Sequence, residues 1–185
     1  AMVAIVKRTA IRLPLTVLFY HSTIGSLATH LQNNETENNW KSLIPIKKDG
    51  TMPPLYIVHG QGMNIIGFRT LAPELGDDQP IYGLQAKGLN PNDEPLDDVE
   101  MIAAEYIKEM LQSNPHGPYA LMGYSSGGLI ALEMSVQLKK IGKEISFLAL
   151  LDTYAEVNDL KALLNEKKYL EIFGYMINRA KHLFS

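Results

Sequence analysis

The sequence predicts an α/β fold, with a mostly parallel sheet and helices on both of its faces. Two observations predict it. From about residue 41 onward, short apolar runs alternate with amphipathic stretches, which is typical of a parallel sheet covered by helices. A serine flanked by glycines lies between one such run and the next amphipathic stretch. The chain has 185 residues, of which 46% are hydrophobic, so it is long enough for one domain with a substantial core.

Residues 1–31 differ from the rest of the chain. They contain three basic residues and no acidic one, which gives +3 and leaves −6 on the remainder of a chain of net charge −3. A short helix is expected here, capped by Thr23 and apolar at Ile24, Leu27 and Leu31. Helices this short cannot bury a core alone. We therefore expect residues 1–31 to be a separate piece, 32–40 to be a polar linker, and 41–185 to be the main domain.

The expected elements of the main domain follow from its apolar pattern. An edge strand is expected at 43–46, because Pro45 has no N–H to donate to a sheet centre. Further strands are expected at 55–58, 81–84, 119–122 and 146–151. Helices are expected over 65–75, from Leu129 until Gly142 stops the helix, and over 156–184. A further helix is expected after an N-cap at Asp97, with Tyr106 on its apolar face.

The segment Gly123-x-Ser125-x-Gly127 matches a nucleophile elbow, a sharp strand-to-helix turn that exposes a serine hydroxyl. The apolar run before it, the amphipathic stretch after it and a further glycine at 128 favour this interpretation over an ordinary glycine-rich turn. Ser125 is therefore the predicted nucleophile. Ser126 is a poorer candidate as nucleophile, but its backbone N–H is a predicted donor to a substrate oxyanion.

Two other strand ends supply the remaining predicted site residues. Asp152 directly follows an apolar run and is the predicted triad acid, in the chain order serine, aspartate, histidine. The alternative is that Asp152 only caps a turn. The N–H of Gln61, in the loop after residue 58, is the second predicted oxyanion donor. His59, in the same loop, is expected to pack or hydrogen-bond beside the strand end.

Composition excludes several classes of function. A net charge of −3 gives no reason to expect nucleic acid as a partner. The absence of cysteine excludes disulfides, thiolate metal sites and cysteine nucleophiles, and no metal site is predicted. No apolar run is long enough to cross a bilayer, and basic residues and Pro14 interrupt any signal-peptide core. A cytoplasmic protein without membrane contact is the simplest expectation.

Four segments together resemble the type I thioesterase domain that ends non-ribosomal peptide synthetases and polyketide synthases. They are residues 54–60 (PLYIVHG), 79–85 (QPIYGLQ), 117–128 (GPYALMGYSSGG) and 148–154 (LALLDTY). The resemblance covers about residues 41–155 and implies the α/β-hydrolase fold. Residues 13–19 (LPLTVLF), with 22–24 and 27–28, are similar to the last helices of a peptidyl carrier domain.

This resemblance implies a reaction. An acyl or peptidyl chain on the carrier's phosphopantetheine passes to Ser125, and water, or an amine or hydroxyl of the chain itself, then releases it as an acid or a ring. The thioesterase itself binds no cofactor, and its partners are the upstream carrier domain and the thioester substrate. Residues 156–185 correspond to the start of the family's helical lid.

The resemblance leaves the catalytic histidine unassigned, because in the family it follows the lid and a further strand. His182 lies in the helical tail, and His116, His21 and His30 are expected at the surface. The chain is therefore expected to be C-terminally truncated and to lack its base. Two alternatives stay open, namely a small-molecule serine esterase and an inactive module that docks a carrier domain.

Overall fold

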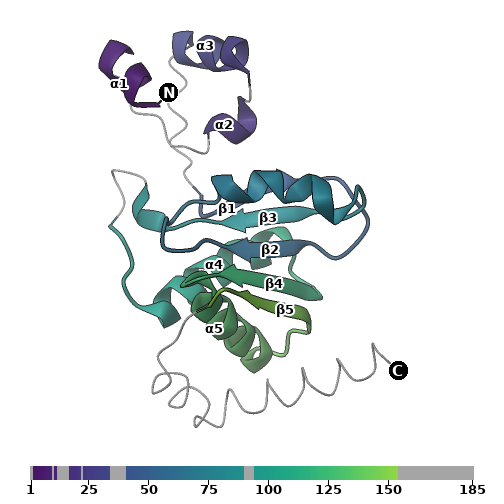
Figure 1. Cartoon of the computed structure of the whole chain (residues 1–185). Coiled ribbons are helices and arrows are strands. Elements are labelled where there is room, and N and C mark those ends of the chain that lie inside the picture. The colour runs from purple at the N-terminus through teal and green to yellow at the C-terminus, as the bar shows by residue number, and fades with distance from the viewer. Residues whose placement is uncertain are drawn as a thin grey trace.

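The computed structural model describes residues 2–9, 11, 17–21, 23–33, 41–89 and 94–153. Figure 1 shows three N-terminal helices grouped apart from a sheet with its helices. The elements are α1 (Met2–Thr9), α2 (Val17–Tyr20), α3 (Ile24–Gln32), β1 (Leu43–Lys47), β2 (Leu55–Val58), the 3₁₀ helices η1 (Ile66–Thr70) and η2 (Ala72–Leu75), β3 (Ile81–Leu84), the 3₁₀ helix η3 (Lys87–Leu89), α4 (Val99–Ser113), β4 (Tyr119–Tyr124), α5 (Gly127–Lys140) and β5 (Ile145–Leu151).

The five strands form one sheet in the order β1-β3-β2-β4-β5. Strands β3, β2, β4 and β5 are parallel, and β1 pairs with β3 in the antiparallel direction (Figure 1). The predicted mostly parallel sheet is therefore confirmed, and so is the position of the Pro45 strand at an edge. Because parallel strands all end on the same side, the loops that follow β2, β4 and β5 meet at one edge of the sheet.

The core lies on both faces of the sheet, because alternate residues of a strand point to opposite sides. Tyr56 and Val58 of β2 belong to a large cluster with the buried sides of α4 and α5. Leu55 and Ile57 belong to a smaller cluster with Ala72 of η2. Helices α4 and α5 thus cover one face, and η1 and η2 cover the other.

The continuous helix expected over 65–75 is wrong. The structure has two short 3₁₀ helices there, which divide at Leu71. Pro73 lies at the start of the second one and has no N–H to donate. The ring also crowds the preceding turn, so an uninterrupted α-helix cannot form across it.

Other element ends differ from the prediction by one or two residues. The N-cap of α4 is Asp98 rather than Asp97, and its carboxylate accepts a hydrogen bond from the N–H of Met101 at 2.8 Å. Strand β4 continues two residues beyond 122, and α5 begins two residues before Leu129. The predicted stop of α5 is confirmed, since Gly142 has a φ of 74°, which favours glycine.

The N-terminal helices confirm one prediction and correct another. Thr23 caps α3 in a reciprocal pair of hydrogen bonds with Ser26, and α3 extends one residue beyond the predicted boundary, to Gln32. His30, however, is buried and not at the surface. Its ring stacks on that of the half-buried His21, with centroids 4.3 Å apart, so each ring covers one face of the other.

Glu109 ties α4 to the start of the sheet, a contact that the sequence did not predict. Its carboxylate accepts hydrogen bonds from the backbone N–H groups of Ser42 (3.1 Å) and Leu43 (2.8 Å). The carbonyl of Ser42 in turn accepts from the N–H of Gln85, just after β3. The edge strand is therefore fixed both to its neighbour and to the helix below it.

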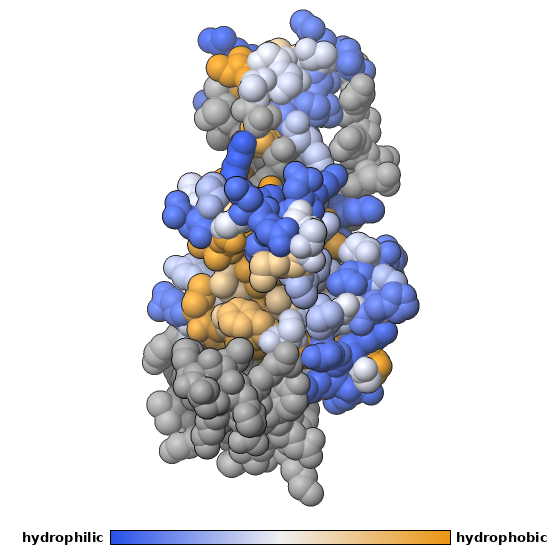
Figure 2. All heavy atoms as spheres, turned by 90° about the vertical axis from the view of Figure 1, so that its right-hand side faces the viewer, coloured by the Kyte–Doolittle hydropathy of each residue, from blue (hydrophilic) through white to orange (hydrophobic). Residues whose placement is uncertain are grey.

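Some large apolar side chains stay exposed near the β5 edge. Phe147 is 52% and Leu151 43% exposed to solvent. Figure 2 shows that hydrophobic side chains gather in the middle of one face of the molecule, with hydrophilic ones above them.

None of the helices in the described part of the chain combines the length and the apolar character that crossing a bilayer requires.

Several predictions concern residues that lie outside the described ones. These are the helix over 156–184, the start of the lid at 156–185, His182, and residues 34–40 of the linker. The domain boundaries accordingly stay predictions, although the described structure does resume at residue 41, where the main domain was expected to begin.

We predict that Glu109→Ala lowers the free energy of unfolding by about 1–3 kcal/mol, because two part-buried N–H groups lose a charged acceptor. Urea unfolding followed by circular dichroism measures this change. Glu105→Ala, on the same helix, removes only a partly exposed pair with Lys108 at 3.6 Å and serves as the control. If the two substitutions lower the free energy of unfolding equally, Glu109 does not stabilise the start of the sheet as proposed.

Candidate active site

The backbone has unusual conformations at the edge where β2, β4 and β5 end. Three non-glycine residues of the described chain have positive φ, namely Met63 (60°), Ser125 (53°) and Asp152 (47°). Each lies in the loop or turn that follows one of these strands. Because such conformations cost free energy and gather at functional sites, they mark this edge as the candidate site.

Ser125 occupies the turn between β4 and α5. Its N–H donates to the carbonyl of Leu151 at 2.8 Å, and its own carbonyl accepts from the N–H of Gly128 at 3.0 Å. The serine is thus fixed to the end of β5 on one side and to the first turn of α5 on the other. This is the sharp strand-to-helix turn that the sequence predicts around Ser125.

Two glycines let α5 approach the strand ends closely. A Cβ atom on Gly127 would lie 2.0 Å from the carbonyl oxygen of His59, and one on Gly128 would lie 1.9 Å from the Thr153 hydroxyl. No side chain fits at these distances. The start of α5 therefore lies directly against both the loop after β2 and the turn after β5.

Asp152 follows the last residue of β5, beside the turn that holds Ser125. The carbonyl that receives the Ser125 N–H belongs to Leu151, the residue immediately before it. The structure therefore brings the two predicted triad members to the ends of adjacent strands. Neither the strain at Asp152 nor the contact of Thr153 with Gly128 was predicted from the sequence.

The two predicted oxyanion donors belong to two neighbouring turns at this edge of the sheet. Gln61 is in the turn after β2, and Ser126 is the residue before α5. Among the described residues, none accepts a hydrogen bond from either backbone N–H. The contact between Gly127 and the His59 carbonyl places both segments against the same helix start. Within the described part of the chain, both N–H groups are therefore left without an acceptor.

His59 is buried at this edge, as the sequence prediction of a packed or hydrogen-bonded residue requires. Its Nε2 atom lies 2.8 Å from the Tyr106 hydroxyl of α4, and its Nδ1 atom lies 2.7 Å from the carbonyl oxygen of Gly60. Burial lowers the pKa of His59 below its usual value, although the contact with the Gly60 carbonyl opposes this. Tyr106 was predicted only as part of an apolar helix face, and no sequence signal indicates its polar contact.

The other described histidines lie elsewhere. His116 is exposed, as predicted, in the loop before β4. Six strand residues separate that loop from Ser125, a span of about 20 Å. His21 and His30 stack on each other in the N-terminal helices.

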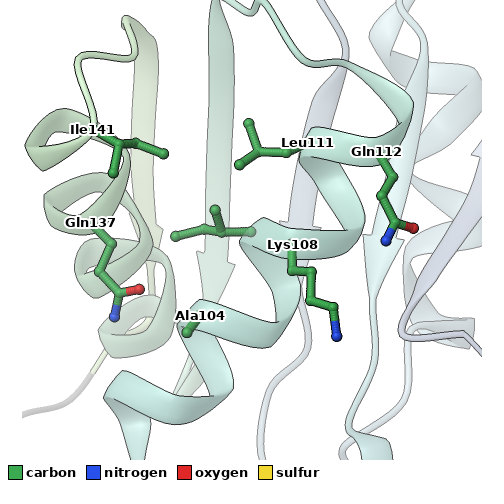
Figure 3. A pocket seen from close by; sticks show the side chains of 7 residues that line it. Ala104, Lys108, Leu111, Gln112, Gln137 and Ile141 are labelled. Carbon is green, nitrogen blue, oxygen red and sulfur yellow. The ribbon is translucent and has the colours of Figure 1, made fainter.

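A separate apolar groove lies between α4 and α5 (Figure 3). It has a volume of about 480 Å³ and is lined by Ala104, Ile107, Lys108, Leu111, Gln112, Gln137 and Ile141. Gln137 is twelve residues along the helix from Ser125, which corresponds to about 18 Å. No predicted site residue lines this groove, so it is distinct from the candidate site.

Known proteins resemble the chain over the part that carries this site. The family model for the thioesterase domain matches residues 53–176. The malpinin synthetase of Mortierella alpina is 37% identical over 161 residues, which are 86% of this chain and 2% of that protein. The indigoidine synthase of Dickeya dadantii is 37% identical over 166 residues, which are 89% of this chain and 11% of that protein. The chain thus spans a small fraction of the length of these relatives.

Solved structures agree with the sequence matches. A four-domain non-ribosomal peptide synthetase, AB3403, superposes with a TM-score of 0.65 at 28% identity, over 83% of this chain and 12% of that chain. The NocB thioesterase domain superposes with a TM-score of 0.57 at 29% identity, over 62% of this chain and 50% of that chain. The fold is therefore that of the α/β-hydrolases, and the chain belongs to the thioesterase domain family.

Proposed function

We propose that this chain carries the acyl-transfer site of a thioesterase that releases an acyl or peptidyl chain from a phosphopantetheinyl carrier domain. The observation that carries the proposal is the conformation of Ser125. It has positive φ in a strand-to-helix turn and is hydrogen-bonded to the residue before Asp152. Among the described residues, nothing accepts from the N–H of Ser126, in the same turn, or from that of Gln61, in the loop after β2. These are the parts that serine acyl transfer requires.

In the proposed reaction, the Ser125 hydroxyl attacks the thioester carbonyl while a base takes its proton. The bond from the serine oxygen to the carbonyl carbon forms, and the carbon–sulfur bond breaks. The departing thiolate takes the proton from the base and becomes the thiol of the carrier's phosphopantetheine. Water, or an amine or hydroxyl of the chain, then attacks the ester, and serine recovers its proton. The N–H groups of Gln61 and Ser126 donate to the oxyanion in both steps.

The base is proposed to be a histidine held by Asp152 and supplied from outside residues 1–153. His59 does not suit this role, because both of its ring nitrogens are already within hydrogen-bond distance of fixed partners. His116 lies at the far end of β4 from Ser125. A serine without such a base is a weak nucleophile. We therefore propose that this histidine lies among the residues that follow 153 in the full-length gene product.

The carrier domain as partner rests on the N-terminal segment. The match to the indigoidine synthase covers 89% of the chain. Residues 41–185 make up less than four fifths of it, so the match includes residues before 41. Synthetase relatives thus share part of the segment that resembles a carrier tail. We propose that the substrate arrives on the phosphopantetheine of the domain to which residues 1–31 belong.

We predict that a fluorophosphonate adds once to the full-length gene product, and that Ser125→Ala abolishes the adduct. Intact-mass spectrometry measures it. The NocB domain named above was solved as a covalent complex with a fluorophosphonate nocardicin G analogue, which supports the choice of probe. Ser126→Ala keeps its backbone N–H and is the control that should still react. An adduct that persists in Ser125→Ala, or none on the unaltered protein, contradicts the proposal.

We predict that Asp152→Asn lowers kcat by about 10³–10⁴-fold, because an amide cannot support a charged histidine in the same way. Asparagine tolerates positive φ, so the backbone of this turn is retained. Release of thiol from an acyl-pantetheine thioester measures the rate. Asp98→Asn, which keeps an N-cap on α4, is the matched control. A loss below tenfold would leave Asp152 as a turn residue only.

We also predict a preference for acyl-pantetheine thioesters over oxygen esters of the same acyl chain, expressed as a ratio of kcat/KM. The carrier-derived arm contributes binding only if the protein receives carrier-bound chains. Parallel assays with the two substrates measure this ratio. Equal or better turnover of the oxygen ester favours a small-molecule esterase.

A further inference from the structure

The buried pair formed by His59 and Tyr106 has no part in the reaction described above. His59 is 6% and Tyr106 1% exposed, and their polar atoms lie 2.8 Å apart. Their rings meet edge to face, with centroids 6.1 Å apart. Burying a polar side chain costs free energy that burying an apolar one of similar size does not, so this pair requires an explanation.

The contacts of His59 define which nitrogen carries the hydrogen. The Gly60 carbonyl only accepts, so Nδ1 must be the donor in the 2.7 Å contact. The Tyr106 hydroxyl then donates to the unprotonated Nε2. Burial lowers the pKa of His59 and raises the pKa of Tyr106, so both side chains stay neutral near pH 7.

The Gly60 carbonyl receives a second hydrogen bond. The N–H of Met63 donates to it at 2.9 Å, so two donors hold this oxygen from different directions. The carbonyl of Gly60 and the N–H of Gln61 belong to the same peptide group. Because that group is planar and trans, the N–H points opposite to the carbonyl. Whatever fixes the Gly60 carbonyl therefore fixes the direction of the Gln61 N–H.

We infer that His59 and Tyr106 are positioning residues that aim the Gln61 N–H at the substrate oxyanion. Tyr106 anchors the imidazole to α4, and the imidazole holds the Gly60 carbonyl. The His59 backbone is itself fixed, since its N–H donates to the Leu84 carbonyl of β3 at 3.0 Å and its carbonyl lies against Gly127. The inference rests on the proposed role of the Gln61 N–H.

The structure offers a matched pair of substitutions to test this. Tyr106→Phe and Tyr119→Phe each remove one hydroxyl from a buried tyrosine that makes one described hydrogen bond, to His59 and to the Asn114 carbonyl respectively. Tyr119 begins β4, at the opposite end of the strand from Ser125. Both substitutions remove one buried hydrogen bond and are expected to cost similar stability, but only Tyr106 contacts the oxyanion loop.

The experiment measures fluorophosphonate labelling of the full-length gene product, resolved into a maximal rate and a half-saturating concentration. This probe needs no knowledge of the natural acyl chain, and its phosphoryl oxygen tests the oxyanion donors. We expect Tyr106→Phe to lower the maximal rate about 3–10-fold and His59→Leu about 10–100-fold, with little change in half-saturation. His59→Asn, whose amide can donate to the Gly60 carbonyl, should recover part of the loss.

Three outcomes separate the possible failures. If Ser125→Ala still labels, the proposed function itself is wrong. If Ser125→Ala is inert but Tyr106→Phe labels as fast as Tyr119→Phe, the pair is structural and the inference is overturned. Imidazole ¹⁵N chemical shifts add a readout without catalysis. They should report a neutral His59 protonated at Nδ1 near pH 7, whereas a ring protonated at Nε2 alone also overturns the inference.

Discussion

The close approach of α5 to the ends of three parallel strands is the constraint on which the whole site depends. Ser125 can connect β4 to α5 so sharply only because Gly127 and Gly128 bring no side chain between the helix and the neighbouring loops. The same approach presses the helix start against the His59 carbonyl and against Thr153. The start of α5 therefore sets the mutual positions of the proposed nucleophile, the proposed oxyanion loop and the proposed acid.

The strained backbone at this edge is held in place by hydrogen bonds that flank it. Residues in sparsely populated conformations cost about 1–3 kcal/mol each, and Met63, Ser125 and Asp152 are three of them. The N–H of Met63 donates to Gly60 and its carbonyl accepts from Ala86, while Ser125 is bonded to Leu151 and Gly128. The strained residues and the hydrogen bonds that hold them thus lie in the same short segments, and these segments are anchored to the strands of the sheet.

The sequence allowed the sheet and the Ser125 turn to be predicted because both have strong local signals. Buried parallel strands are apolar throughout, and the elbow requires glycines at fixed spacing. The 3₁₀ helices were missed because apolar spacing around 65–75 fits a helix, although Pro73 forbids a continuous one. The cap of α4 was off by one because Asp97 and Asp98 are equally good caps in sequence.

Contacts between distant segments left no local signal. Glu109 lies on a helix and accepts from residues 66 and 67 positions earlier in the chain, and Tyr106 reaches a histidine 47 positions away. The apolar spacing of α4 predicts that Tyr106 is buried, but not that its hydroxyl has a partner. Likewise, the composition of residues 1–31 gives no indication that His30 is buried against His21. Such pairings follow from how the elements pack, which only the structure describes.

A histidine at a site of this kind can act as a general base or can hold a neighbouring group in place, and its surroundings favour one role or the other. A general base needs a pKa near the working pH and a nitrogen free to take a proton from the nucleophile. His59 lacks the free nitrogen, since both of its nitrogens have fixed partners, and burial lowers its pKa below the usual value. An imidazole whose two nitrogens are both hydrogen-bonded is well suited to holding a carbonyl, because its two partners oppose rotation of the ring. We therefore propose that the base supported by Asp152 is a second histidine, and that His59 serves to position the Gly60 carbonyl in the proposed oxyanion loop.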